Sequence, residues 1–296
     1  MVRIRDLKKS YKVFPVLRGL NMDIYDGDVY GFLGRNGCGK TTTMNIICDI
    51  IEKDDGEITL GDGERPVTIG YLPESPTIFG YMTAREYLEY IAACSNYDGD
   101  IAKRTSEVLE VVGLSSAADR RTKGFSRGMT QRLGMGAAIF RSPELLIFDE
   151  PTSALDPQGR SEVIEIINRL KSMGSTIVLS THILSDVERV ANRIGIINGG
   201  VLAEEGDIKS ILRKHGGDVI NLTVRNLTQE NKIELLKVDF ARAEFNNETG
   251  QFRFGADNAE DTAKRLLKLL AEKDMLVEEF KIGTATLEEV FRKVVG

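Results

Sequence analysis

The stretch Gly34-Arg35-Asn36-Gly37-Cys38-Gly39-Lys40-Thr41 follows a short apolar run, residues 29–33, and opens a segment with helical character. It fits the pattern G-x-x-x-x-G-K-[ST] of a phosphate-binding loop. Glycines let the backbone fold so that successive N–H groups enclose phosphate oxygens. The helix that follows adds the positive end of its dipole. A chance glycine-rich turn is the alternative, and the strand before and helix after the loop argue against it.

The residue types in this loop point to a nucleoside triphosphate with a metal ion. Lys40 supplies a point charge to the β- and γ-phosphates. The Thr41 hydroxyl is a hard oxygen ligand for Mg²⁺, and Thr42 can reach the α-phosphate. The nucleotide-binding residues expected here are Gly34, Arg35, Asn36, Gly37, Cys38, Gly39, Lys40, Thr41 and Thr42.

Cys38 has two interpretations. Any small side chain could suffice at this point of the loop. Alternatively, the helix N-terminus and Lys40 lower the pKa of its thiol, in which case alkylation blocks ATP binding and ATP protects the thiol.

A second motif is the apolar run that ends in Asp149 and Glu150. Asp149 is expected to hold Mg²⁺, directly or through water. Glu150 lies one residue further along, so its side chain points the other way and can polarise a water in line with the γ-phosphate. An acidic strand end that faces solvent is the alternative, which the phosphate loop makes the weaker one.

The pattern along residues 1–215 predicts an α/β domain, with strands and helices that alternate and a mostly helical insertion at about 75–144. Thr83 and Glu86 form a capping box at the start of one helix, and Gly113 ends another. The expected strands are 2–5, 20–24, 29–33, 68–72, 145–148 and 176–179, with a hairpin over 194–203 and helices at 42–51 and 101–112.

Composition shifts near Lys214-His215-Gly216-Gly217, where we place the domain boundary. Residues 216–296 form the second domain, and their pattern is β-α-β-β-α-β, which is typical of a ferredoxin-like fold. The expected elements are a strand at 218–225, a helix at 229–238, strands at 239–246 and 251–255 around a turn at 246–250, a helix at 258–273, a strand at 276–282 and a last helix at 287–295. This domain has no catalytic cluster. We interpret it as a regulatory or dimer-stabilising module, with a passive appendage as the alternative.

Composition narrows the possible functions. The chain has 296 residues, 42% hydrophobic and 28% charged, and a net charge of −6, so binding to nucleic acid is not expected. No apolar stretch approaches the roughly 18 residues of a membrane helix, and the N-terminus has no signal core. We therefore expect a cytoplasmic protein that acts on a membrane only through another subunit. Cys38, Cys48 and Cys94 lack metal-ligand spacing and are expected to be free thiols.

Four further segments, in order along the chain, resemble those of the ABC ATPase family over about residues 2–215. Tyr11 resembles the aromatic residue that stacks on adenine, although it could instead pack a sheet edge. His182 resembles the switch histidine that contacts the γ-phosphate. Two segments resemble further motifs of the family. The signature sequence corresponds to Ser126, Arg127, Gly128 and Met129, and the D-loop corresponds to Ser153, Ala154, Leu155 and Asp156.

The resemblance implies a P-loop NTPase fold and ATP hydrolysis with Mg²⁺, with Glu150 and His182 as catalytic residues. Two nucleotide-binding subunits would face each other head to tail, each ATP lying between one phosphate loop and the partner's signature residues. This chain has one set of motifs, so a second copy or a homologue is needed. An integral-membrane permease would receive the motion. A soluble ABC ATPase acting on a ribosome, DNA or a protein complex is the alternative. A GTPase or kinase leaves the signature, the D-loop and His182 unexplained.

Two departures from the family pattern indicate which branch of the family the chain resembles. Glu74 occupies a position where the family most often has glutamine, and we include it with Thr41 and Asp149 among the expected metal ligands. Phe125, Arg127 and Met129 replace the usual signature residues. These features, with the tail at 285–291, resemble the ABC-2 branch, whose members are mainly exporters. Export is therefore expected.

One apolar segment follows Glu74, namely Ile78, Phe79, Tyr81 and Met82. It could form a pocket for a short cytoplasmic helix of the membrane subunit. Ordinary core packing explains it equally well.

Overall fold

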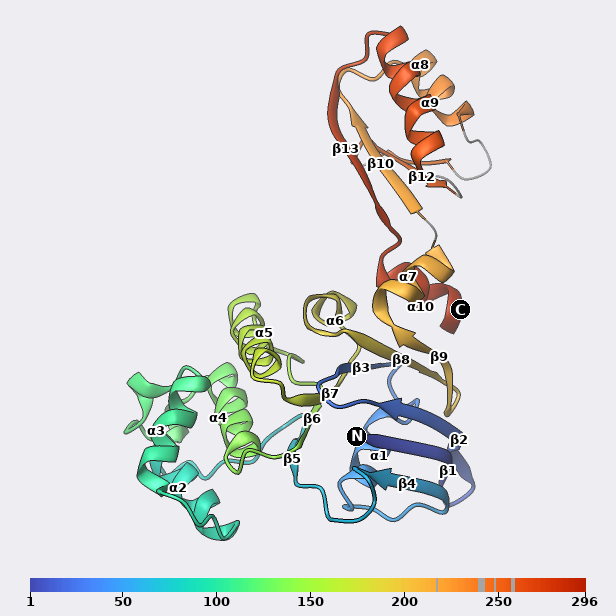
Figure 1. Ribbon diagram of the computed structural model, residues 1–296. Coiled ribbons are helices and arrows are strands. Elements are labelled where there is room, and N and C mark those ends of the chain that lie inside the picture. The colour runs from blue at the N-terminus through green and yellow to red at the C-terminus, as the bar shows by residue number, and fades with distance from the viewer. Residues whose placement is uncertain (217, 239–242, 248, 257–258) are drawn as a thin grey trace. The chain divides into compact units, whose positions relative to one another are not determined.

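The computed structural model describes residues 1–216, 218–238, 243–247, 249–256 and 259–296 (Figure 1). The chain packs as two compact units, one of Met1–Ile208 with Val295 and one of Lys209–Val294 with Gly296. A functional boundary after residue 215 stays a prediction.

A six-stranded, mostly parallel sheet forms the centre of the first unit. Its order is β5 (Ile69–Leu72), β6 (Leu145–Asp149), β7 (Thr176–Thr181), β3 (Val29–Leu33), β8 (Arg193–Asn198) and β9 (Val201–Asp207). All residues of β3, β6 and β7 are buried, as expected for parallel strands covered on both faces. Only β9 runs antiparallel to its neighbour, and it forms the expected hairpin with β8. The carboxyl ends of β3, β6 and β7 therefore meet at one edge, where the phosphate loop and the acidic pair lie.

A second, antiparallel sheet has the order β2 (Phe14–Ile24), β1 (Val2–Tyr11) and β4 (Asp55–Leu60). The sequence pattern predicts only parts of β1 and β2, because register shifts between Ile4 and Leu7 and between Lys9 and Ser10 interrupt the alternation. It does not predict β4, whose first three residues are acidic or glycine. Buried side chains of both sheets and of the first helix share one core, which includes Ile4, Leu20, Phe32, Met44 and Ile147.

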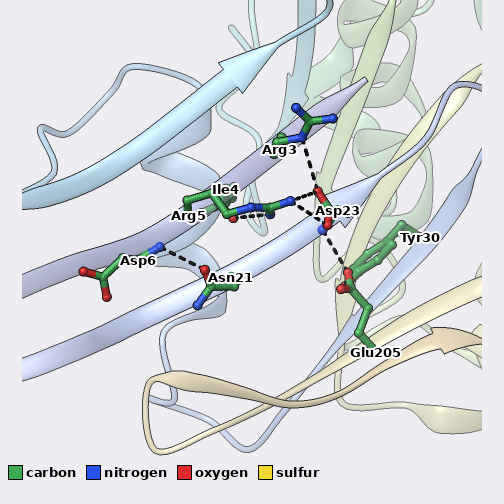
Figure 2. Close-up of polar contacts among 8 residues, drawn as sticks. All are labelled: Arg3, Ile4, Arg5, Asp6, Asn21, Asp23, Tyr30 and Glu205. Atoms are coloured by element: carbon green, nitrogen blue, oxygen red, sulfur yellow. Dashed lines mark hydrogen bonds and ion pairs between the residues drawn. The ribbon is translucent and has the colours of Figure 1, made fainter.

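A polar network also joins the two sheets (Figure 2). The Arg5 guanidinium donates to Asp23 of β2 at 2.9 Å, and the Asp23 backbone N–H donates to Glu205 of β9 at 3.0 Å. Glu205 also accepts from the hydroxyl of Tyr30, which is fully buried in β3, at 2.7 Å. These bonds connect β3, the strand that carries the phosphate loop, to β9 of its own sheet and, through Glu205, to β2 of the antiparallel sheet.

Helices of the first unit include the predicted ones and two more, at 157–172 and 184–190, that the sequence pattern did not predict. They are α1 (Lys40–Ile47), α2 (Ala84–Cys94), α3 (Ile101–Val111), α4 (Arg127–Ile139), α5 (Pro157–Ser172) and α6 (Leu184–Val190). The capping box of Thr83 and Glu86 is present at α2. Helix α1 ends four residues earlier than predicted, since Asp49 adopts a left-handed conformation with φ 56°. Helices α2, α3 and α4 lie between β5 and β6 in the chain and form the expected helical subdomain.

The second unit has the predicted order β-α-β-β-α-β. It contains β10 (Asp218–Val224), α8 (Gln229–Lys237), β11 (Ala243–Asn246), β12 (Gln251–Ala256), α9 (Ala259–Glu272) and β13 (Val277–Thr284), between α7 (Ile208–Gly216) and α10 (Leu287–Val295). The antiparallel sheet has the order β11-β12-β10-β13, and Ile220, Leu222, Phe252 and Phe254 face Leu266 of α9 in its core. Residues 239–242 of one predicted strand, 248 of the predicted turn and 258 of one predicted helix lie outside the described residues.

Candidate nucleotide-binding and hydrolysis site

The phosphate loop connects β3 to α1 through two glycines that no other residue could easily replace. Gly37 and Gly39 have φ values of 79° and 112°, in the left-handed region that favours glycine. A Cβ atom on Gly39 would lie 2.7 Å from the side chain of Leu17, so this position is closed to larger residues. The Thr43 hydroxyl donates to the Gly39 carbonyl at 2.8 Å and holds the first turn of α1. These constraints hold the loop at the start of α1.

Lys40 is the buried cation of the site. Its side chain is only 6% exposed, and its ammonium group donates to the Gly34 carbonyl at 2.9 Å. The same nitrogen lies 3.6 Å from a carboxylate oxygen of Glu150. Burial of a lysine charge requires polar partners. The Gly34 carbonyl and the Glu150 carboxylate provide them here.

Asp149 is the last residue of β6 and Glu150 follows it, and the two carboxylates contact different groups. The Ser180 hydroxyl donates to buried Asp149 at 2.5 Å, and the Glu150 backbone N–H donates to that hydroxyl at 3.0 Å. Glu150 has a left-handed φ of 49°, which costs roughly 1–3 kcal/mol in a non-glycine residue. This conformation brings its carboxylate within 2.9 Å of His182 Nδ1. Lys40, Glu150 and His182 thus meet although they lie far apart in sequence.

A cavity of about 440 Å³ opens over this cluster. Its lining contains six of the nine predicted loop residues, and Gly34, Arg35 and Cys38 are not among them. Glu74, Glu150, Ser153 and His182 also line it, with one residue that sequence analysis missed, Val16 of β2. The complete lining is Val16, Asn36, Gly37, Gly39, Lys40, Thr41, Thr42, Glu74, Glu150, Ser153 and His182. The cavity combines one buried cation with carboxylate, hydroxyl and imidazole groups, which suits a phosphorylated ligand.

The signature residues do not line this cavity. Ser126 is the N-cap of α4, as predicted, and its hydroxyl accepts from the Met129 backbone N–H at 3.2 Å. Ser126 and Arg127 are exposed, and Gly128 and Met129 are half-buried. The start of α4 is therefore open to a ligand from outside this chain.

The D-loop leads from the site into α5. Ser153 lines the cavity, and Ala154 has a left-handed φ of 52°. Asp156 is the N-cap of α5 and accepts from the Gly159 backbone N–H at 2.8 Å. Leu155 is half-buried between them. This loop connects the hydrolysis site directly to a long helix.

Tyr11 lies opposite Phe14 in the tight turn between β1 and β2. Tyr11 is 48% and Phe14 73% exposed, so neither ring is buried by the packing of the sheet. Tyr11 is not among the cavity residues, although Val16 of the same hairpin is. Stacking of Tyr11 on adenine stays a prediction.

The prediction for the Cys38 thiol was wrong in direction. Burial raises the pKa of Cys38, and the nearby Lys40 charge lowers it by less. The sulfur packs against Gly34 so closely that a Cβ there would lie 2.4 Å from it. Desolvation disfavours the thiolate more than one cation and a helix N-terminus favour it.

The raised pKa of the Cys38 thiol predicts low reactivity at neutral pH. Iodoacetamide should modify Cys38 slowly at pH 7, since the thiolate is the reactive form. The rate should rise about tenfold per pH unit up to the thiol's raised pKa. Peptide mass spectrometry over pH 6–10 measures it, with exposed Cys94 as the internal reference. Modification of Cys38 that is as fast as that of Cys94 at pH 7 would contradict this expectation.

Ser180 was also missed by sequence analysis. It holds both Asp149 and the Glu150 backbone, and it pairs with Asp149 in the parallel register of β6 and β7. A hydroxyl residue two positions before His182, at a strand end, was the available signal. Only the strand order makes it a neighbour of the acidic pair.

An aromatic cluster lies on the surface beyond Glu74. The Phe79 ring centroid is 5.7 Å from that of Tyr81, 6.4 Å from that of Tyr87 and 5.5 Å from that of Tyr90. Phe79 is 36% and Tyr81 64% exposed, whereas Tyr87 is buried. Ile78 and Met82 are half-buried. Core packing therefore accounts for part of this segment and leaves the rings of Phe79 and Tyr81 available.

Comparison with known proteins agrees with this geometry. Residues 17–153 match the family model described as ABC transporter, and residues 206–295 match the one described as ATP-binding protein DrrA1-3-like, C-terminal domain. The linearmycin resistance ATP-binding protein LnrL of Bacillus subtilis (strain 168) is 34% identical over 77% of this chain and 76% of its own length. The bacitracin transport ATP-binding protein BcrA of Bacillus licheniformis is 34% identical over 100% of this chain and 97% of its own.

A solved structure described as an ATP-binding subunit of an ABC transporter has a TM-score of 0.64. It is 28% identical and covers 79% of this chain and 98% of its own. Among the described residues, no helix is both long and apolar enough to cross a membrane.

Proposed function

The chain belongs to the family of ABC transporter ATP-binding subunits, and from that premise we propose how its residues hydrolyse ATP and which partners it serves. ATP is its ligand and ATP hydrolysis its activity. The observation that carries the assignment of residues is the meeting of Lys40, Glu150 and His182 at one cavity.

Each of the three residues has a role that its contacts support. Lys40 neutralises the β- and γ-phosphates. Glu150 accepts a hydrogen bond from the attacking water and takes up its proton. His182 contacts the γ-phosphate. The Glu150 carboxylate lies 3.6 Å from the Lys40 ammonium group and 2.9 Å from His182 Nδ1. ATP binding draws Lys40 to the phosphates and so frees the carboxylate for the water.

Magnesium fits the donors at this site. Thr41 and Glu74 line the cavity and Asp149 lies at the end of β6, which provides hydroxyl and carboxylate oxygens of the kind Mg²⁺ prefers. Among the described residues, no group of three or more His, Cys, Asp or Glu is arranged to hold a metal alone. This agrees with an ion held by one or two carboxylates together with substrate phosphates. When bound, Mg²⁺ offsets the negative charge that develops on the phosphates.

A second nucleotide-binding subunit completes the site. Ser126 and Arg127 are exposed at the start of α4 and lie outside the cavity of their own chain. Backbone N–H groups at a helix start attract phosphate. We therefore assign Ser126 and Gly128 to the γ-phosphate of ATP bound by a partner, either a second copy or a homologue. A regulatory or dimer-stabilising role for the C-terminal unit stays a prediction.

The membrane partner is a permease that receives the motion of the pair. The exposed rings of Phe79 and Tyr81 provide an aromatic surface for one of its cytoplasmic helices. Relatives named for bacitracin transport and linearmycin resistance support a transporter that exports its substrate, because removal of a compound confers resistance to it. We therefore propose that the chain acts on the cytoplasmic face of the membrane.

Purification in mild detergent tests the transporter assignment. The tagged chain is recovered from its native cells, and the proteins that accompany it are identified. A polytopic membrane protein in about equal amount is the expected result. Recovery with ribosomes or soluble partners alone would instead favour the soluble ABC ATPase.

The double change Phe79→Ser and Tyr81→Ser should weaken this association. Loss of two aromatic anchors costs at least about 2 kcal/mol, or roughly 30-fold in affinity. The recovered membrane protein is measured beside the ATP affinity of the purified variant, which should stay within about twofold. Tyr25→Ser is the matched control, since Tyr25 is also an exposed aromatic residue of this unit. Undiminished recovery with the double variant would refute the docking surface.

A further inference from the structure

A single ion pair joins the two helices that follow the D-loop and His182. Arg160 Nη2 of α5 lies 2.9 Å from Asp186 Oδ1 of α6. The Asp186 side chain is 4% exposed and that of Arg160 is 32% exposed. Within the part of the chain that the structure describes, the second carboxylate oxygen of Asp186 is buried and has no hydrogen-bond partner. A buried carboxylate with one unpaired oxygen is a costly arrangement, so stability alone does not explain it.

Both partners lie close in sequence to the hydrolysis site. Arg160 is in the first turn of α5, four residues after Asp156, the N-cap that ends the D-loop. Asp186 is in the first turn of α6, four residues after His182. Ser153 of the D-loop and His182 line the same cavity. The ion pair thus connects the helices that follow Ser153 and His182, two residues that already line the same cavity.

Neither helix has much freedom to move independently of these segments. A Cβ on Gly31 of β3 would lie 2.6 Å from Val187, so α6 packs directly on the strand that carries the phosphate loop. A Cβ on Gly159 would lie 2.9 Å from the Asp156 carboxylate, so the start of α5 packs tightly against its own cap. The D-loop is therefore tied to Arg160, and through Asp186 to the helix that follows His182.

We propose that Arg160 and Asp186 are positioning residues for ATP hydrolysis, which keep His182 in register with the D-loop. The inference rests on the proposed role of His182. Because α6 also packs on β3, the ion pair fixes the start of α5 to the layer that carries the phosphate loop, so that the D-loop and His182 keep their places at the cavity. Removal of the pair leaves nucleotide binding intact and impairs the hydrolysis step.

Asp186→Asn tests the pair with little change in shape. Asparagine has nearly the same shape but no charge, so the ion pair with Arg160 is lost, and Arg160 can still reach water. Misplacement of a group at the reaction centre costs up to about 100-fold, so we expect kcat to fall about 10- to 100-fold. The KM for ATP and the ATP affinity should change by less than about twofold, because Lys40 and the phosphate loop are untouched.

Variants of Arg160 separate positioning from folding. Arg160→Lys keeps the charge and should retain more activity than Arg160→Met. The double variant Arg160→Met/Asp186→Asn contains no unpaired buried charge, so it should fold even if Arg160→Met does not. Its kcat should equal that of Asp186→Asn within about twofold, because one interaction is lost in both. Arg169→Met is the control, since it breaks the exposed contact of Arg169 with Glu110 further along α5.

Three results would overturn the inference. Asp186→Asn could keep the wild-type kcat, or its activity could fall only in proportion to the folded fraction seen in thermal unfolding. The double variant could also show the product of the two single losses. In each case Glu150→Gln still reports whether the site hydrolyses ATP as proposed. A wild-type chain that cannot hydrolyse ATP would instead overturn the proposed function and this inference with it.

Discussion

Glu150→Gln is expected to lower the rate of ATP hydrolysis by about 10²- to 10⁴-fold while ATP still binds. Glutamine has the shape of glutamate but cannot take a proton from water. The loss of charge also releases Lys40, whose ammonium group lies 3.6 Å from this carboxylate. ATP affinity should therefore stay the same or increase, and the ATP-bound pair of subunits should accumulate.

Single-turnover hydrolysis, nucleotide binding and gel filtration with ATP measure these three consequences separately. Glu144→Gln is the matched control, because Glu144 lies just before the other end of the same strand and pairs with exposed Arg65. It should leave the rate within about twofold. Full turnover by Glu150→Gln would remove Glu150 from its assigned role.

The parts of the site that sequence predicts are those whose chemistry is local. Gly37, Gly39 and Lys40 are constrained by the backbone and charge of one loop, and the structure places them as expected. Ser126 caps α4 for the same reason, since capping depends on the residues of a single turn. The split β-α-β-β-α-β order also follows from local periodicity, and the second unit has it.

The parts that sequence does not predict depend on distant neighbours. Ser180 holds Asp149 only because β6 and β7 are adjacent in the sheet. The pKa of Cys38 depends on how far its sulfur is buried against Gly34, which no residue near it in sequence reveals. The ion pair of Arg160 with Asp186 likewise requires the packing of α5 on α6. Local charge suggested a reactive Cys38, and burial reversed that expectation.

Lys40→Met is expected to weaken ATP binding by about 100-fold or more, because a charge-assisted contact to phosphate is lost in a buried site. Methionine keeps most of the apolar stem of lysine. Removal of the ammonium group also leaves the Gly34 carbonyl without its donor and Glu150 without its cation. Fluorescent-nucleotide binding measures the affinity, and thermal unfolding without nucleotide shows how much of the change is structural.

Ser126→Ala provides the contrast that separates the two halves of the site. It removes a hydroxyl that lies outside the cavity of its own chain, so monomeric ATP binding should stay within about twofold while hydrolysis is lost. Loss of the cap on α4 costs about 1 kcal/mol. Asp100→Ala removes the comparable cap of α3 and should leave hydrolysis unchanged.

An equal mixture of Lys40→Met and Ser126→Ala chains then distinguishes a site within one chain from a site between two. In a head-to-tail pair, the mixed dimer joins an intact phosphate loop from one chain to an intact signature from the other. If the sites act independently, random pairing should restore roughly one quarter of the wild-type rate. Differently tagged copies show whether mixed dimers form. If mixed dimers form but do not hydrolyse ATP, Ser126 serves the nucleotide of its own chain or no nucleotide at all.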